Sequence, residues 1–323
     1  MNQNPKWDSK RPGSRMGHHV FYGMIRLGGQ RLARPLAYFS LYFVVFYYIA
    51  FFPSVKQKCA PYLKQRFPTA SRFKQFFHRY QWVLSLGKTL IDRAILGILG
   101  PETFLASFEN QEDFTAIQSL DSGFIILMSH VGCWQLAMSA LAHLKRPVNL
   151  LMLQNEGDID KHYYEHGNQE KKFNIINPAQ FLGGSIEMLS VLKKDEILCI
   201  MGDRIFGKTD LSLKMDFLNG KALFPYSAYK LASISQKPIV ILHSYKSGPG
   251  TYKIALPRIL QIPPKLGKDK KKIYPFIQAF VQSLETYIQN HPYQFFNFYD
   301  MWEPAESFGK QGEKNGLKGD GDV

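Results

Sequence analysis

Short apolar runs alternate with amphipathic stretches along the chain after Pro101. The runs that we expect to be strands are 124–128 (FIILM), 148–153 (VNLLML), 196–201 (EILCIM) and 238–245 (PIVILHSY). Stretches with helical spacing lie between and after them, at 133–144, 180–193, 225–235 and 273–290. Strands that alternate with helices form parallel βαβ units. We therefore predict an α/β fold with a mostly parallel central sheet flanked by helices.

Proline and glycine mark the borders of two of these elements. Pro225 stands where the helix over 225–235 begins, and proline is favoured in the first turn of a helix. The sequence KSGPG separates PIVILHSYK from TYKIALPRI, with a turn at Ser247 to Gly250. This pattern predicts a hairpin that gives the fourth strand an antiparallel neighbour.

The N-terminal third has a different pattern, with few β-branched runs. Residues 20–100 are expected to be helical, with breaks near Pro53, Pro61, Pro68 and Pro101. The predicted organisation has four parts: a loose polar arm (1–19), a helical membrane-associating region (20–100), an α/β domain (101–303) and a flexible tail (304–323).

One apolar segment stands out within the helical region. Residues 36–52, LAYFSLYFVVFYYIAFF, carry no formal charge over 17 residues and are flanked by basic residues on both sides. The segment fits a buried core helix, a single membrane span at the lower limit of length, or a helix held among lipid headgroups. A spanning helix normally has its basic residues biased to one side. We therefore favour an anchor that enters one leaflet from the cytoplasmic face.

The charge balance points to an anionic partner. The chain has 40 Lys and Arg against 26 Asp and Glu, a formal net charge of +14. Nucleic acid and an anionic bilayer both attract such a chain. The mixed basic and aromatic stretch 72–82 (RFKQFFHRYQW) suits either, but no nucleic-acid-binding module is recognisable and the apolar segment favours lipid. The basic stretch 263–272 is either solvated or in contact with phosphate headgroups.

The three cysteines exclude two classes of site. Cys59, Cys133 and Cys199 are far apart and form no zinc-like or CxxC spacing. They fit a reducing, cytosol-facing environment and no metal is expected.

Candidate chemistry gathers where two predicted strands end. The strand at 124–128 runs into Ser129, His130 and Gly132, and MGDRIFG places Asp203 and Arg204 after the strand at 196–201. Ligands of open parallel sheets lie beyond the carboxyl ends of the strands. If the two strands are near neighbours, His130, Asp203 and Arg204 share one cleft. Gly132 allows a tight bend before a helix that begins near Cys133.

These residues carry a resemblance to a known family. The stretch SHVGCWQLA resembles the first block of the lysophospholipid acyltransferase superfamily, a His followed after four residues by Asp or Glu. Its HxGxW pattern is most like the branch of lipid A lauroyl and myristoyl acyltransferases. MGDRIFG with the following DFLNGKALFPYSAYKLASISQKPIVILHSY, and the closing HPYQFFNFYDMW, are similar to later blocks of that branch in the same order. The resemblance covers roughly residues 20–303.

The resemblance implies transfer of a fatty acyl group from coenzyme A or acyl carrier protein to a hydroxyl or amine of a lipid-like acceptor. No cofactor is implied, since the acyl thioester is a substrate. His130 would be the general base, and Gly132, Trp134 and Arg204 would contact substrate, with Arg204 holding a phosphate or carboxylate. The implied partners are anionic membrane lipids, the acyl donor and the acceptor, without nucleic acid. The implied location is the cytoplasmic face of the inner membrane.

The sequence departs from the family at Gln135, which stands where the acid is expected. An amide can orient the imidazole through its oxygen but supplies no charge. Asp203, Glu156 or Asp158 could replace the acid, or an amine acceptor could need less help from a base. Alternatively, the chain keeps the scaffold as a lipid-binding protein without catalysis. Cys133 is a weaker candidate for a nucleophile, and no GxSxG is present.

Overall fold

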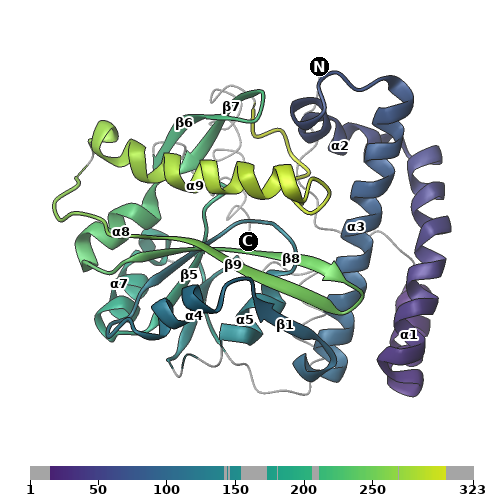
Figure 1. The fold of residues 1–323 in the computed structure, drawn as a ribbon, viewed down its shortest axis with the longest axis horizontal. Helices are drawn as coiled ribbons and strands as arrows, with labels where there is room; N and C mark the ends of the chain where they lie inside the picture. The colour runs from purple at the N-terminus through teal and green to yellow at the C-terminus, as the bar shows by residue number, and fades with distance from the viewer. Residues whose placement is uncertain are drawn as a thin grey trace, which may run out of the picture.

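A seven-stranded sheet has helices on both faces, and a pair of long helices stands beside it (Figure 1). The computed structural model describes residues 15–153, 173–205 and 211–302, apart from residues 142, 143, 145, 180 and 268. The helices are α1 (Arg15–Phe51), α2 (Pro53–Arg66), α3 (Arg72–Leu99), η1 (Pro101–Thr103), α4 (Gln111–Gln118), α5 (Trp134–Leu141), η3 (Phe181–Gly184), α7 (Ser185–Lys193), α8 (Ser227–Ser235) and α9 (Lys270–Asn290). The strands are β1 (Leu105–Phe108), β2 (Ile125–Met128), β3 (Val148–Leu151), β4 (Asn174–Ile176), β5 (Ile197–Met201), β6 (Ser212–Phe217), β7 (Gly220–Pro225), β8 (Ile239–Gly248) and β9 (Thr251–Leu260).

The sheet has the order β1-β9-β8-β2-β5-β3-β4, and each neighbouring pair is parallel except β8 and β9. The predicted fold class and the four predicted strands are confirmed, and β8 and β9 form the expected hairpin. The sequence pattern did not reveal β1 and β4, which are short edge strands, or the separate β6–β7 hairpin. β1 and β4 are short and largely unburied, so they lack the continuous apolar run that marked β2 and β3.

Alternate residues of the central strands enter two cores. In β2, Ile125 and Leu127 belong to the core formed with α7, α8 and α9, whereas Ile126 and Met128 belong to the core formed with α4 and α5. All four side chains are buried, as expected for a parallel strand covered on both faces. A shift of one residue would exchange the two sets of side chains. This packing therefore fixes the point at which the chain leaves β2.

Two proline predictions were wrong. Pro225 does not open a helix: it ends β7, opposite Ser212, and α8 begins at Ser227. An edge strand accepts proline because its N–H is not needed for a ladder. Pro61 lies inside α2 instead of breaking it. The missing N–H leaves only the carbonyl of Gln57 without its helical donor, and Gln57 is exposed to water.

The N-terminal region is helical, as expected for residues 20–100, but α1 begins at residue 15, inside the stretch expected to be a loose arm. α1 bends at Gly29, which has φ 59°, and runs antiparallel beside α3 (Figure 1). α3 also contributes Trp82, which is fully buried, to the core formed with α7, α8 and α9. The helical region and the α/β domain are therefore packed together through α3.

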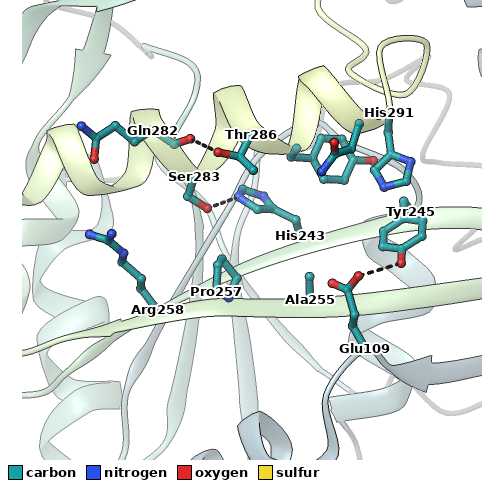
Figure 2. Close-up of a pocket in the computed structure, with 12 residues that line it drawn as sticks. Glu109, His243, Tyr245, Ala255, Pro257, Arg258, Gln282, Ser283, Thr286 and His291 are labelled. Atoms are coloured by element: carbon teal, nitrogen blue, oxygen red, sulfur yellow. Dashed lines mark hydrogen bonds between the residues drawn. The ribbon is translucent and has the colours of Figure 1, made fainter.

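A buried histidine joins three elements near the end of β2. His243 of β8 is 2% exposed; its Nδ1 lies 3.3 Å from Ser129 Oγ and its Nε2 lies 2.8 Å from Ser283 Oγ of α9. Its ring borders a pocket of about 400 Å³ between α9 and the β8–β9 hairpin (Figure 2). Burial lowers the pKa of His243 from 6.5 to about 4. The ring is therefore neutral near pH 7 and bridges the two serines.

His243 predicts a pH dependence of stability. An unfolded histidine binds a proton below about pH 6.5, whereas the folded His243 resists protonation until about pH 4. The free energy of unfolding should therefore fall by up to about 3 kcal/mol between these values because of this residue. His243→Gln keeps hydrogen-bonding groups but does not titrate, so this part of the dependence should disappear.

Urea unfolding at pH 7 and pH 4.5 measures the difference for both proteins. All other titrating groups are common to the two, so their contribution cancels. An equal loss of stability in wild type and His243→Gln would contradict the assignment.

Candidate active site

His130 and Asp203 lie just beyond two adjacent parallel strands. Met128 of β2 is paired with Met201 of β5, and each of the two polar residues follows its methionine by two positions. His130 Nδ1 lies 2.9 Å from Asp203 Oδ1 and 3.0 Å from Oδ2, and the backbone N–H of His130 donates to Oδ2 at 3.0 Å. The strand register thus brings together two residues that are far apart in sequence.

The environment of the pair favours a neutral ring and an ionised carboxylate. Burial lowers the pKa of His130, the charge of Arg204 lowers it further, and Asp203 opposes both. Burial raises the pKa of Asp203, but contacts with His130 and the charge of Arg204 outweigh it and hold that pKa below its usual range. The side chain of Asp203 is 1% exposed and that of His130 is 22% exposed. The Nδ1–H of a neutral His130 can therefore donate to Asp203, leaving Nε2 as the proton acceptor.

Gln135 stands where an acid is expected from the sequence. It is buried on α5, and its Oε1 lies 3.6 Å from Cys133 Sγ. Asp203 engages His130 Nδ1, so the structure gives the orienting contact to Asp203. The two other acids considered, Glu156 and Asp158, lie outside the described residues.

Gly132 provides the turn that the sequence indicated. Its φ is +53°, and a Cβ there would lie 2.0 Å from the carbonyl oxygen of Ser244. Any side chain would therefore collide with β8. Its N–H donates to the carbonyl of Gln294 at 2.9 Å. Gly132 thus shapes the turn, while its amide is engaged by the backbone.

The two residues that follow Gly132 pack against the cores beside the turn. Trp134 begins α5, is partly buried and packs against the core that contains Phe124. Cys133 is fully buried, and burial raises the pKa of its thiol to about 11. A thiol with such a pKa is a poor nucleophile near pH 7. The structure gives no support to a Cys-His nucleophile.

Arg204 is tied to the C-terminal part of the chain. Its Nη2 donates to the carbonyl of Phe296 at 2.9 Å, and its guanidinium lies 5.7 Å from the centre of the Tyr299 ring. The hydroxyl of Tyr299 donates to the carbonyl of Asp203 at 3.2 Å. These contacts hold the charge of Arg204 beside the histidine–aspartate pair.

Residues 294–296 form a support for the site that the sequence did not reveal. The N–H of Phe296 donates to the carbonyl of His130 at 2.7 Å, and Phe295 forms an isolated antiparallel bridge with Val131. The indole of Trp82 donates to the carbonyl of Phe295 at 2.8 Å. Only the resemblance of HPYQFFNFYDMW to a family block marked this segment. Its role depends on contacts across more than 160 residues of chain.

Among the described residues, no group of three or more His, Cys, Asp or Glu is placed to hold a metal ion. The described site offers a partly exposed imidazole, a buried carboxylate that orients it and a nearby guanidinium. This arrangement can remove a proton from a substrate and keep the resulting imidazolium close to a negative charge.

The chain is similar to known proteins in sequence and in fold. The family model described as bacterial lipid A biosynthesis acyltransferase matches residues 73–303, more than half of the chain. Four chains of known structure also match. One is the 1-acyl-sn-glycerophosphate (LPA) acyltransferase PlsC from Thermotoga maritima, with 12% identity, a TM-score of 0.37, and coverage of 80% of this chain and 98% of that chain. No curated protein matched. The extent of the family match shows that this chain belongs to the bacterial lipid A biosynthesis acyltransferase family.

Proposed function

We propose that this chain transfers a fatty acyl group from an acyl thioester to a hydroxyl or amine of a lipid-like acceptor, with His130 as general base. Membership of the family indicates acyl transfer to a lipid-type acceptor. The contact that carries the proposal for this chain is the one between His130 and Asp203, which supplies the charge that Gln135 lacks. The donor is a coenzyme A or carrier-protein thioester.

The reaction needs one proton acceptor that later becomes a donor. His130 Nε2 takes the proton as the acceptor oxygen or nitrogen attacks the thioester carbonyl. Asp203 stabilises the imidazolium that forms. When the carbon–sulfur bond breaks, His130 returns the proton to the thiolate that leaves. The positive end of α5, which begins at Trp134, would stabilise the transient oxyanion, and Arg204 would hold an anionic group of a substrate.

The outer side of α1 supports a place at the membrane. Large apolar side chains recur there at helical spacing and are exposed: Leu32, Leu36, Phe39, Phe43, Phe46 and Tyr47. The opposite side, with Val45 and Ile49, packs on Leu84 of α3. A helix that leaves an aromatic stripe in water is not a buried core helix. Arg26 and Arg31 of α1 and Lys56 and Lys64 of α2 are exposed and supply positive charge.

The contacts of α3 favour an anchor in one leaflet over a span. Among the described residues, Gly28–Phe51 is the one stretch long and apolar enough to cross a bilayer, by length and composition only. Lys88 of α3 donates to the hydroxyl of Tyr42, near the middle of that stretch. A spanning α1 would carry this ammonium group into the hydrocarbon, which is costly. We therefore propose that α1 lies at the cytoplasmic face with its exposed stripe in the lipid.

Asp203→Asn should lower acyl transfer by about 10²- to 10⁴-fold, because the amide cannot stabilise the imidazolium or enforce the reactive tautomer. His130→Ala should abolish transfer. The assay follows a labelled acyl group from acyl-coenzyme A or acyl carrier protein to a panel of lipid acceptors in membranes that contain the protein.

Gln135→Glu is the matched control for these variants. It places a carboxylate at the family position, but Asp203 already engages His130 Nδ1, so no gain in activity is expected. A gain in Gln135→Glu with an unaffected Asp203→Asn would assign the acid to position 135. Transfer that is equal in wild type and His130→Ala would instead favour a lipid-binding protein without catalysis.

Replacing Phe39, Phe43 and Phe46 together by Ser should weaken binding to vesicles at least about 10-fold, since each buried Phe contributes about 1.5–3 kcal/mol. Sedimentation with phosphatidylglycerol-containing vesicles measures this. Ile186→Ser with Ile234→Ser changes exposed apolar residues away from α1 and should leave binding unchanged. Equal vesicle binding by wild type, the triple Phe variant and the double Ile variant would show that the α1 stripe is not the docking surface.

A further inference from the structure

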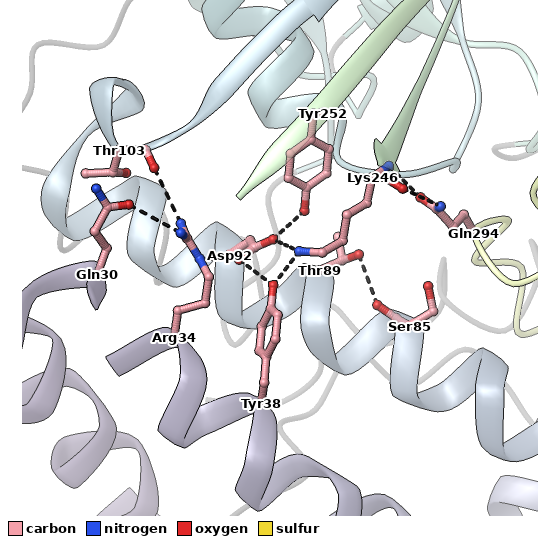
Figure 3. Close-up of polar contacts among 10 residues, drawn as sticks. All are labelled: Gln30, Arg34, Tyr38, Ser85, Thr89, Asp92, Thr103, Lys246, Tyr252 and Gln294. Atoms are coloured by element: carbon pink, nitrogen blue, oxygen red, sulfur yellow. Dashed lines mark hydrogen bonds and ion pairs between the residues drawn. The ribbon is translucent and has the colours of Figure 1, made fainter. Parts of the chain in front are cut away.

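A buried carboxylate connects α1 with the sheet (Figure 3). Asp92 of α3 is fully buried and takes donors from three elements. Its Oδ1 accepts from Tyr38 at 2.8 Å and from Arg34 Nε at 3.3 Å, both on α1. Its Oδ2 accepts from Tyr252 of β9 at 2.7 Å and from the ammonium of Lys246 at the end of β8. Loss of the α1 donors would leave a buried charge less well compensated, which is costly.

Lys246 extends the connection to the candidate active site. Its backbone N–H donates to Gln294 Oε1 at 2.7 Å, and Gln294 Nε2 donates back to its carbonyl at 3.0 Å (Figure 3). The carbonyl of Gln294 accepts the N–H of Gly132 at 2.9 Å, and Phe296, two residues on, donates to the carbonyl of His130. A path of hydrogen bonds, linked through Lys246 and Gln294 themselves, thus connects α1 with the turn that carries His130.

The two sides of α1 have different partners. Arg34 and Tyr38 face Asp92, whereas the stripe that contains Leu36, Phe39 and Phe43 is exposed. Lipid can bind the stripe while the other side of the helix stays on α3. In water, exposure of these apolar side chains is unfavourable, so arrangements of α1 that bury the stripe are stabilised. Lipid that takes up the exposed stripe would stabilise the arrangement in which Asp92 is paired with Arg34 and Tyr38, and such a difference in affinity shifts a conformational equilibrium.

We propose that Asp92, Lys246 and Gln294 are positioning residues that transmit the docking of α1 on lipid to the His130 turn, so that acyl transfer is faster at a lipid surface. The inference rests on the proposed function and adds a regulation of the same site. None of the three residues takes part in proton transfer. They act by holding the backbone of Gly132 and His130 in place.

The test compares two single hydroxyl deletions at the interface of α1 and α3. Tyr38→Phe removes a donor to Asp92, whereas Tyr80→Phe removes a hydrogen bond from α3 to the carbonyl of Tyr42 outside the path. Turnover is measured with a short-chain acyl thioester and a monomeric acceptor, with and without phosphatidylglycerol-containing vesicles. Wild type and Tyr80→Phe should be stimulated at least about fivefold, the lower range of allosteric coupling. Vesicles should stimulate Tyr38→Phe clearly less than wild type. The difference should lie in kcat, and Tyr38→Phe should bind vesicles as wild type does.

Hydrogen exchange of the peptide that contains Gly132 gives a readout that does not require turnover. Vesicles should slow this exchange in wild type and Tyr80→Phe, and less so in Tyr38→Phe and Gln294→Leu. Thermal unfolding of each variant identifies any that fail to fold, and Tyr38→Phe leaves every charge in the path unchanged.

The outcomes separate the two proposals. Absence of transfer in wild type, with the expected pattern of exchange, would reject the proposed function and keep the connection. Transfer that depends on His130, with equal stimulation of Tyr38→Phe and Tyr80→Phe or with no stimulation at all, would overturn the connection and keep the function.

Discussion

The hydrogen bonds between Asp203 and His130 depend on the register of two parallel strands. A buried carboxylate is unfavourable unless donors surround it, because its loss of hydration costs several kcal/mol. Here a ring nitrogen and a backbone N–H of the same residue both face the carboxylate. The two donors are in place only because Met128 and Met201 are paired. This pairing places the residues that follow β2 beside the residues that follow β5. The packing of β2 between two cores holds that register.

The same pair explains how the site can work with a glutamine at position 135, where an acid is expected from the sequence. A general base needs an oriented imidazole and a nearby negative charge, and neither requirement specifies where in the sequence the carboxylate stands. An acid five residues after the histidine is one solution. An acid at the end of the adjacent strand is physically equivalent when its oxygen reaches Nδ1, as Asp203 does. Gln135 can then be buried beside Cys133 without the need to supply charge.

The histidine turn is also supported from outside the sheet. The segment 294–296 binds the backbone of residues 130–132, and Trp82 and Gln294 connect this segment to α3 and β8. Because α3 packs on α1, the part of the chain with the exposed aromatic stripe and the part with the candidate base form one hydrogen-bonded unit. If the stripe docks on lipid as proposed, the docking surface and a lipid-type acceptor lie in the same phase.

The sequence by itself determined the α/β class, the four central strands and the long helices, because these depend on local hydrophobic periods that buried strands and amphipathic helices require. It also indicated His130, Asp203 and Gly132, since strand ends and glycine turns are local features. Only the tertiary structure decided that Asp203 orients His130, that Gly132 faces Gln294 and that Asp92 joins α1 to β8. Each of these contacts depends on which strands are neighbours and how helices pack across long separations, and no local pattern of residues specifies that.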